Sequence, residues 1–252
     1  MTATHPGTPS VPSPSADEAN PVKDFYARNE SVWDPANAER LERFVAAYRG
    51  HRARLGRALS ILDLGCGRVP YLATRTLNGD DYWAADIAPP HVEVQNFVPI
   101  DFNTFKGADA LAGRIFDVIY CGELIEHVFS PDSLLEWLKT LMHKESLLIL
   151  STPNLAYWVN RLLLILGITP LFLENSSRRR LGRRFRFLGQ GGNVQGHIRV
   201  FTHRAMLELL AEQQFNVKTV ISVPVWNLPF DRLACRSPHF AADNIYLLSL
   251  PG

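Results

Sequence analysis

ALSILDLGCG, residues 58–67, is the stretch of this sequence that decides the fold. The segment from Ala58 to Leu64 is mostly apolar and predicts a strand that is buried on both faces, as in a parallel sheet. Gly65 and Gly67 follow at once, and glycine lets the backbone turn tightly and approach a ligand closely. A helix after such a turn would present free N–H groups to that ligand. The stretch therefore predicts a strand, a tight turn and a helix.

Short apolar segments recur along the rest of the chain and alternate with segments of helical pattern. Because strands that alternate with helices form parallel sheets covered on both faces, the fold class is α/β, a doubly wound sheet. We expect one domain over residues 21–252. Strands are predicted at 82–87, 97–101, 116–121, 146–150, 217–223 and 244–250, and helices at about 35–55, 131–141 and 202–214, the last with Thr202 as its N-cap.

Two regions depart from this alternation. Residues 1–20 are rich in proline and serine and have nothing apolar to anchor them, so we expect a disordered tail. Residues 155–196 form an insertion between the fifth strand and the next helix. Loops at this edge of an open sheet build the binding site, so the insertion is expected to be a substrate lid.

Composition excludes several classes of protein. Of the 252 residues, 46% are apolar and 20% are charged, which is typical of a globular domain, and the net charge of +1 disfavours a general polyanion-binding surface. Three cysteines are too few for a disulfide framework or a zinc cage. No apolar run reaches the length of about 20 residues that spans a membrane, and the N-terminus lacks the features of a signal peptide. We therefore expect a cytoplasmic protein.

Acidic residues stand where two further strands end, at Asp86 and Asp101. An acid about 20 residues after the glycines is placed to bind ribose hydroxyls. Asp101 could accept a hydrogen bond from an adenine amino group, with Phe102 packing on the ring, although strand-end aspartates also serve in turns. Asp63 would repel a pyrophosphate but could bind an amine, and Pro70 replaces the third glycine of the dinucleotide pattern. These features together favour S-adenosylmethionine.

The same segments resemble class I S-adenosylmethionine-dependent methyltransferases. Residues 61–67 match the first motif of that family, and residues 116–127 match its fourth-strand region. Residues 151–154 and 196–202 resemble a branch that includes ubiquinone-type O-methyltransferases and bacterial secondary-metabolite and glycan methyltransferases. The resemblance implies a Rossmann-like sheet of seven strands in the order 3-2-1-4-5-7-6, with an antiparallel last strand and helices on both faces.

The resemblance also implies the cofactor, S-adenosyl-L-methionine. One departure is Val69, where the third glycine of the family falls, and it keeps open the alternative of a non-catalytic cofactor-binding protein. The expected cofactor-binding residues are Asp63, Gly65, Cys66 and Gly67 in the first loop, Asp86 and Ile87 at the ribose, Asp101 and Phe102 at the adenine, and Cys121 and Gly122 near the sulfonium.

Methyl transfer is a direct displacement that often requires removal of the acceptor's proton. Glu123, Glu126 and His127 are spaced so that they share one face if they lie on a helix. Three interpretations stay open. His127 is a base oriented by a carboxylate, or these residues with His197 bind a divalent metal such as Mg²⁺, or they are structural and Glu126 pairs with Arg199. In each case His197 could close over the acceptor.

The expected function is methyl transfer to an oxygen of a small-molecule, glycan or lipid-linked acceptor, and an RNA methyltransferase is an alternative. Residues 155–190 carry seven arginines against Glu174 alone, next to the apolar run Leu162–Leu166. This suits a peripheral membrane or lipid-linked contact through residues 158–186, or a phosphate-bearing acceptor, with a solvated lid or dimer surface as the alternative. Nucleic acid is disfavoured because aromatic residues are sparse among the arginines. The sequence does not indicate an oligomeric state.

Overall fold

The structure is a computed structural model that describes residues 35–225 and 229–252. The chain divides into two units, residues 1–30 and 31–252, and every described residue belongs to the second. The tail expected at residues 1–20 lies outside the described residues.

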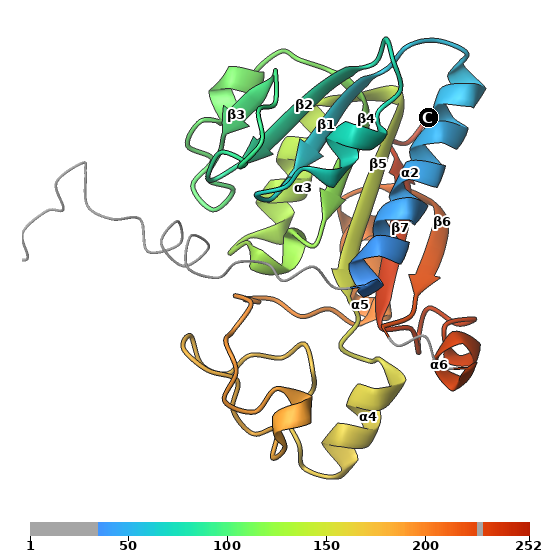
Figure 1. Cartoon of the computed structure of the whole chain (residues 1–252). Helices are drawn as coiled ribbons and strands as arrows, with labels where there is room; N and C mark the ends of the chain where they lie inside the picture. Colours follow the sequence, from blue (N-terminus) through green and yellow to red (C-terminus); the bar gives the residue numbers. More distant parts are fainter. Residues whose placement is uncertain (1–34, 226–228) are drawn as a thin grey trace, which may run out of the picture. The chain divides into compact units, whose positions relative to one another are not determined.

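A seven-stranded sheet with the order β3-β2-β1-β4-β5-β7-β6 forms the centre of the second unit (Figure 1). Its strand pairs are parallel except for the two that involve β7. The predicted fold class and strand order are therefore confirmed. The strands are β1 Ser60–Leu64, β2 Asp81–Asp86, β3 Phe97–Pro99, β4 Phe116–Gly122, β5 Met142–Pro153, β6 Asn216–Val223 and β7 Asp243–Ser249.

Prolines affect where these strands end. β5 continues beyond both of its predicted ends, to Met142 and Pro153. Pro99 ends β3, and because β3 lies at the edge of the sheet, the missing N–H of a proline is tolerated there. Residues 87–96 form bends and contain no helix, as their two prolines predict.

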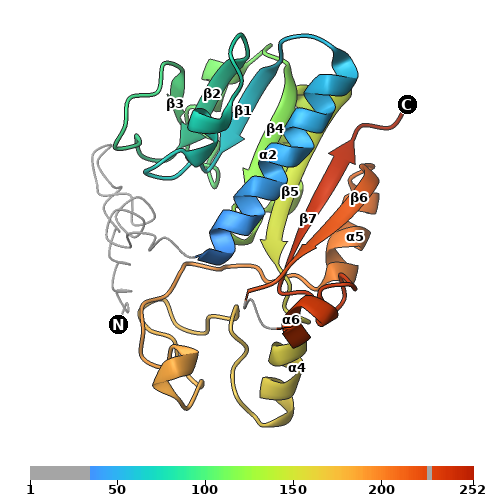
Figure 2. The same cartoon turned by 45° about the vertical axis from the view of Figure 1, so that its right-hand side comes forward.

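Helices cover both faces of the sheet (Figures 1 and 2). On one face, Phe44 of α2 packs with Val118 and Tyr120 of β4. On the other face, Ile119 and Cys121 of the same strand pack with side chains of α3 and α5. Both faces of β4 are thus buried, which explains its nearly continuous apolar sequence. These helices are α2 Pro35–Leu55, α3 Pro131–Thr140 and α5 His203–Glu212.

The insertion leaves the sheet at the end of β5. It forms helix α4, Trp158–Ile165, and then an irregular segment with a 3₁₀ turn at Arg186–Leu188. Helix α6, Pro229–Ala234, precedes β7. Tyr157 Oη and Trp158 Nε1 both donate hydrogen bonds to Asp231 Oδ1, at 2.7 and 2.9 Å, and so attach α4 to α6. Within the described ranges, no helix is both long and apolar enough to cross a membrane.

Polar contacts also fix the segments of chain at the start of α5 and at the end of β5. Thr202 accepts a hydrogen bond from the N–H of Ala205 and is the N-cap of α5, as predicted. Asn154, directly after β5, donates from Nδ2 to the carbonyl oxygens of Pro238 and Ala241. Its Oδ1 accepts from the N–H of Ala156. One amide side chain thus joins the end of β5 to the segment that leads into β7.

Candidate functional site

The glycine turn after β1 forms as the sequence predicts, but the helix predicted after it is wrong, since only a 3₁₀ turn, Tyr71–Arg75, follows. Gly65 and Gly67 have φ angles of +66° and +69°, in the left-handed region that favours glycine. Asp86, at the end of β2, accepts hydrogen bonds from the N–H groups of Gly67 at 2.9 Å and of Ile87 at 2.7 Å. Its carboxylate thus joins the turn to β2. Because a carboxylate offers about four lone pairs, it retains acceptor capacity for the hydroxyls of a ribose.

Asp63 is the acid directly before this turn. Its side chain is buried, and Oδ2 accepts a hydrogen bond from Tyr82 Oη at 2.6 Å. Burial raises the pKa of Asp63 to about 7. The hydrogen bond from Tyr82 opposes this rise, and the nearby charge of Asp86 adds a smaller increase. An ammonium group beside Asp63 would favour its charged form. The position therefore suits a cationic ligand group.

The two residues expected at the adenine, Asp101 and Phe102, have different surroundings. Asp101 Oδ1 accepts a hydrogen bond from the N–H of Asn103 at 2.9 Å. Phe102 is buried in the core, where its ring lies 6.2 Å from that of Trp137 on α3, measured between centroids. Only 7% of Phe102 is exposed, so most of its ring faces the core.

The residues expected near the sulfonium are set back from the surface. The side chain of Cys121 is fully buried in the core, and burial raises the pKa of its thiol as it does for Cys66. Gly122 lies against α2, because a Cβ atom placed there would be 2.9 Å from Phe44 Cε2. Of these two positions of β4, only Gly122 is partly exposed.

The residues after β4 do not form the expected helix. Glu123 has a φ of +53°, and a 3₁₀ turn at Ile125–His127 follows. The carboxylate of Glu123 accepts from Ser151 Oγ at 2.8 Å and pairs with Arg40 at 3.2 Å. The prediction that Glu123 shares a face with His127 is therefore wrong, since the left-handed residue breaks the helical spacing.

Glu126 lies inside the protein with 1% of its surface exposed. Its Oε2 accepts a hydrogen bond from Thr152 Oγ1 at 3.0 Å, and its Oε1 lies 3.9 Å from His127 Nε2. Oε1 has no hydrogen-bond partner among the described residues. Burial, and then the charge of Glu123, raises the pKa of Glu126 well above its usual range. Burial thus favours the neutral form of the carboxyl group that stands beside the histidine.

The expected ion pair between Glu126 and Arg199 is not formed. The guanidinium of Arg199 donates instead to the carbonyl oxygen of Phe129 at 2.9 Å. The contact between the two segments is made by the main chain, since the N–H groups of Ile198 and Arg199 donate to the carbonyl oxygen of Glu126 at 2.8 and 2.9 Å. The end of the insertion is therefore attached to the 3₁₀ turn without a charge pair.

His127 and His197 form a histidine pair, with their ring centroids 5.0 Å apart. His127 Nδ1 lies 3.0 Å from the carbonyl oxygen of Gly196, and His197 Nδ1 lies 2.9 Å from that of Phe172. A carbonyl oxygen only accepts, so each Nδ1 carries a proton and Nε2 is the basic nitrogen of the neutral ring. Glu126 and the pair place their ligand atoms within 4.8 Å of one another. Such a cluster can hold a proton or a metal ion.

The His127 ring is nearly buried. Burial, and then the neighbouring His197, lowers the pKa of His127 to about 4. The ring is therefore neutral at pH 7, with Nε2 as its unprotonated nitrogen.

The insertion contributes a residue that sequence reasoning did not single out. The carboxylate of Glu174 accepts from the N–H groups of Gln195 at 2.7 Å, Gly196 at 2.7 Å and His197 at 3.2 Å. Arg180 Nε lies 3.6 Å from Glu174 Oε1. The feature of the sequence that could have pointed to Glu174 is that it is the single carboxylate in a strongly basic segment.

Two more charged residues at this edge were not expected. Arg40 of α2 bridges Glu123 to Asp243, whose Oδ2 lies 3.3 Å from Arg40 Nη1. Because β7 runs antiparallel to β5, its first residue, Asp243, lies where β5 ends. Burial, and then the charge of Glu123, raises the pKa of Asp243 well above its usual range. The strand order implied by the resemblance was the signal that could have located it.

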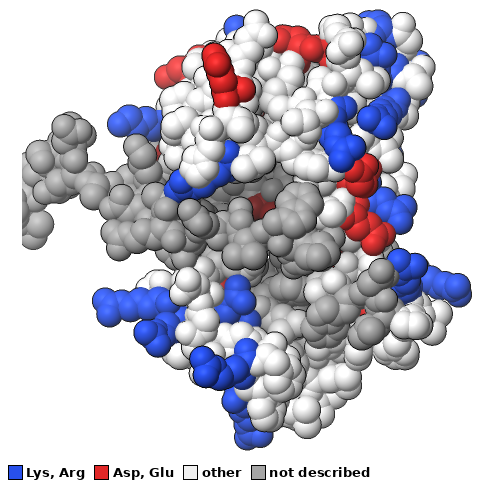
Figure 3. Space-filling view, in the orientation of Figure 1, with Lys and Arg blue, Asp and Glu red and all other residues white. Residues whose placement is uncertain are grey.

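The part of the insertion at residues 181–188, which we call the tip, is built around a buried arginine. Arg183 is 2% exposed and donates to the carbonyl oxygens of Leu188, at 3.1 Å, and Leu171. Burial lowers its pKa to about 10. The rings of Phe185 and Phe187 stack on the surface with their centroids 5.3 Å apart. Figure 3 shows Lys and Arg side chains around the lower part of the view, where Figure 1 places the insertion.

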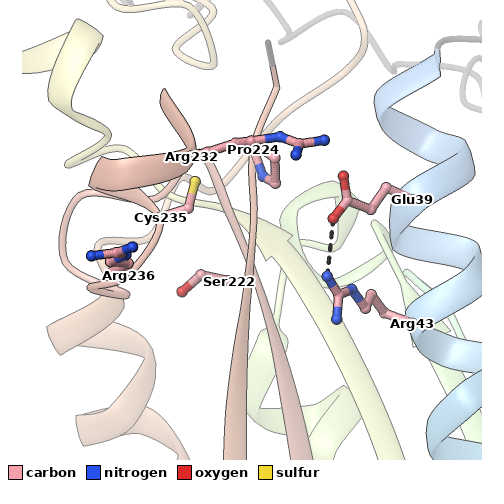
Figure 4. Close-up of a pocket in the computed structure, with 7 residues that line it drawn as sticks. All are labelled: Glu39, Arg43, Ser222, Pro224, Arg232, Cys235 and Arg236. Atoms are coloured by element: carbon pink, nitrogen blue, oxygen red, sulfur yellow. Dashed lines mark hydrogen bonds and ion pairs between the residues drawn. The ribbon is translucent and has the colours of Figure 1, made fainter. Parts of the chain in front are cut away.

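A hollow of about 300 Å³ lies apart from these residues, between α2, β6 and α6 (Figure 4). None of the expected site residues lines it. Burial raises the pKa of Cys235 to about 11, so the only thiol in its lining is protonated at pH 7. The hollow is lined by Glu39, Arg43, Ser222, Pro224, Arg232, Cys235 and Arg236.

Comparison with known proteins connects this geometry to a family. A model of the methyltransferase domain family matches residues 34–220. A ubiquinone biosynthesis O-methyltransferase of Cereibacter sphaeroides is 35% identical over 103 residues, which are 38% of this chain and 42% of that protein. This match thus spans about two fifths of the relative's length. The enzyme of the same name from a Chelativorans species is 29% identical over 180 residues, which are 62% of this chain and 68% of that protein.

A solved structure resembles almost the whole chain. It is the 1,6-didemethyltoxoflavin-N1-methyltransferase of Burkholderia thailandensis with bound 1,6-didemethyltoxoflavin and S-adenosylhomocysteine. The TM-score is 0.53 at 17% identity, and the match covers 96% of this chain and 93% of that one. At this identity the likeness establishes the fold.

Proposed function

We propose that this chain, which belongs to the methyltransferase domain family, transfers a methyl group from S-adenosylmethionine to an oxygen of a small-molecule or glycan acceptor. One observation carries the proposal: a glycine turn with two acids and a histidine pair lie at the carboxyl edge of the same sheet. In open α/β sheets, ligands bind at this edge.

The acids and the turn are assigned to the cofactor. Asp63 binds the ammonium group, Asp86 binds the ribose hydroxyls, and Asp101 accepts from the adenine amino group. Each contact pairs an acceptor with a donor that S-adenosylmethionine carries. The other cofactor-binding residues in this proposal are Gly65, Cys66, Gly67, Ile87, Phe102, Cys121 and Gly122.

His127 is assigned the role of general base. As the acceptor oxygen attacks the methyl carbon, the carbon–oxygen bond forms and the carbon–sulfur bond breaks, and the acceptor's proton passes to His127 Nε2. The Nδ1 proton is held by the carbonyl of Gly196, so Nε2 is the nitrogen to which the acceptor's proton is assigned. The products are the methyl ether or ester and S-adenosylhomocysteine.

A divalent metal is the second candidate for the same cluster. Glu126, His127 and His197 converge, and each histidine donates its Nδ1 proton to a carbonyl, the usual support for a metal-binding imidazole. Two imidazoles and one carboxylate suit a transition metal better than the Mg²⁺ expected from the sequence. A bound metal would acidify the acceptor hydroxyl. Chelation followed by addition of Mn²⁺ or Zn²⁺ tests this, and an unchanged rate would exclude a metal role.

Calorimetry with S-adenosylmethionine and S-adenosylhomocysteine tests the proposed function. We expect micromolar binding of both and none of nicotinamide dinucleotides. An acceptor screen then follows the appearance of S-adenosylhomocysteine. Absence of binding to either adenosyl ligand would contradict the proposal. Tight binding without turnover of any acceptor would favour the alternative of a non-catalytic cofactor-binding protein.

We also propose that the insertion contacts an anionic membrane surface. Large apolar side chains are exposed here, with Phe187 82% exposed and Ile165 of α4 80% exposed. Exposed arginines stand beside them, and this combination favours anionic headgroups over neutral ones. The exposed arginines are Arg178, Arg179, Arg184 and Arg186.

Flotation with lipid vesicles tests this contact. We expect the full chain to float with vesicles that contain phosphatidylglycerol and to remain unbound with phosphatidylcholine alone. Phe187→Ser should reduce flotation at least tenfold. Ile115→Ser, which changes an apolar side chain directly before β4 that is 46% exposed, is the matched control and should leave flotation unchanged. Equal flotation of Phe187→Ser and the unaltered chain would overturn the proposal.

A further inference from the structure

Three consecutive main-chain N–H groups point at one carboxylate in the insertion. Those of Gln195 and Gly196 lie 2.7 Å from the oxygens of Glu174, and that of His197 lies 3.2 Å away. Successive N–H groups that converge in this way form an anion-binding concavity, and here the anion belongs to the chain itself. Hydrogen bonds to a charged acceptor are about twice as strong as neutral ones.

The segment held by Glu174 carries one of the two carbonyl contacts that orient the histidine pair, together with His197 itself. The carbonyl oxygen of Gly196 accepts from His127 Nδ1, and His197 is itself the last residue bound by the carboxylate. Gly196 has a φ of +91°, which no side chain tolerates easily. The direction of the Gly196 carbonyl is therefore set by an unusual main-chain conformation, and Glu174 stabilises that conformation.

Glu174 itself is well fixed. Its side chain is 4% exposed, and the guanidinium of Arg180 lies beside it. Arg180 is in turn held through its main chain, which donates to the carbonyl of Gly192 at 2.9 Å and accepts from the N–H of Gly191 at 2.8 Å. The ion-pair partner of the Glu174 carboxylate is thus itself held in place by main-chain hydrogen bonds within the insertion.

From these contacts we propose that Glu174 is a positioning residue for the histidine pair. It acts through residues 195–197. By binding their N–H groups, it fixes the carbonyl of Gly196, which selects the Nδ1–H tautomer of His127, and it also fixes the position of His197. The chemical role of the histidines rests on the proposed function. The placement of their rings does not, and it is measured without turnover.

The variant Glu174→Gln tests the proposal. The amide keeps one acceptor oxygen and turns the other into a donor, so at least one of the three N–H groups loses its partner. We expect amide hydrogen exchange at Gln195 and Gly196 to accelerate at least tenfold. The ring ¹⁵N signals of His127 should lose the pattern of a single Nδ1–H tautomer. Turnover should fall at least tenfold with the affinity for S-adenosylmethionine unchanged, which also establishes that the variant is folded.

Glu208→Gln is the matched control. It makes the same chemical change in an exposed ion pair with Arg204 on α5, and all these quantities should match those of the unaltered chain. If Glu174→Gln leaves amide exchange and the histidine signals unchanged, the positioning role is overturned. If the histidine signals change and turnover does not, the positioning role stands and the assignment of His127 as the base fails.

Discussion

The two ends of the candidate site are built in different ways. At the glycine turn, Asp86 binds a main-chain group only 19 residues earlier in the chain, at Gly67. At the histidine pair, His127 meets the carbonyl of Gly196 across 69 residues. One end thus follows from a local strand–turn–strand pattern, whereas the other exists only when the insertion folds back onto the sheet. The two ends should therefore respond separately to substitution.

Loss of the His127 imidazole should separate the two ends of the site most clearly, because it should lower turnover without changing cofactor affinity. His127→Ala should lower turnover by about 10²–10⁴-fold, the usual contribution of general base catalysis, because it removes the base assigned to the acceptor's proton. The affinity for S-adenosylmethionine, measured by calorimetry, should stay unchanged. Full activity in this variant would leave only a structural role for the residue.

Removal of the buried arginine tests whether the insertion opens independently of the sheet. Arg183→Leu leaves the carbonyl oxygens of Leu171 and Leu188 without this donor, which costs about 1–3 kcal/mol for each acceptor that finds no other partner. Amide exchange within the insertion should therefore accelerate about tenfold or more, while exchange in β1 and β2 should not change. Arg186→Leu, at an exposed arginine, is the control. Equal acceleration in the sheet would mean that the two regions unfold together.

Substitution at the end of β2 should affect the cofactor end alone. Asp86→Ala removes the carboxylate assigned to the ribose and should weaken S-adenosylmethionine binding at least tenfold, or about 1.4 kcal/mol. The ring ¹⁵N signals of His127 should remain as they are. Asp109→Ala changes an exposed aspartate and serves as the control in the same titration. Unchanged affinity in Asp86→Ala would remove the ribose assignment.

The smallest expected effect is a dependence of cofactor affinity on pH. With a pKa of about 7, Asp63 is mostly neutral at pH 6 and mostly charged at pH 7.5. If the charged form binds the ammonium group, affinity should rise by about eightfold over this interval. Asp63→Asn should abolish that dependence in calorimetric titrations at the same two pH values. An identical pH profile in the variant would assign the titration to another group.

The raised pKa of Asp63 also has a consequence for the stability of the cofactor-free protein. Between the ordinary carboxyl pKa near 4 and the folded value near 7, the folded state holds a proton that the unfolded state has lost. The contribution of Asp63 to the free energy of unfolding is therefore present below pH 4 and lost as the pH rises to 7.

The difference between the two ends also explains what could be predicted from the sequence. The α/β fold class and the glycine turn follow from short apolar strands and from glycines directly after the first of them, whereas the strand order was implied by the family resemblance. The left-handed Glu123 was missed because the spacing of three polar residues fits a helix equally well. The bridge from Arg40 to Asp243 spans 203 residues, and no local pattern reports such a contact. Glu174 was missed although its contacts span only 21 to 23 residues, because they lie in an irregular segment without the periodic pattern of a strand or helix.

Gly122 at the end of β4 restricts the order in which the sequence can change. A side chain there would meet the ring of Phe44, which stacks on Tyr120 with centroids 5.6 Å apart. Position 122 can therefore gain a methyl group without strain only after position 44 has become smaller. The reverse order passes through an overpacked intermediate. The two positions are therefore energetically coupled. When residues change one at a time, the substitution at position 44 has to precede the one at position 122.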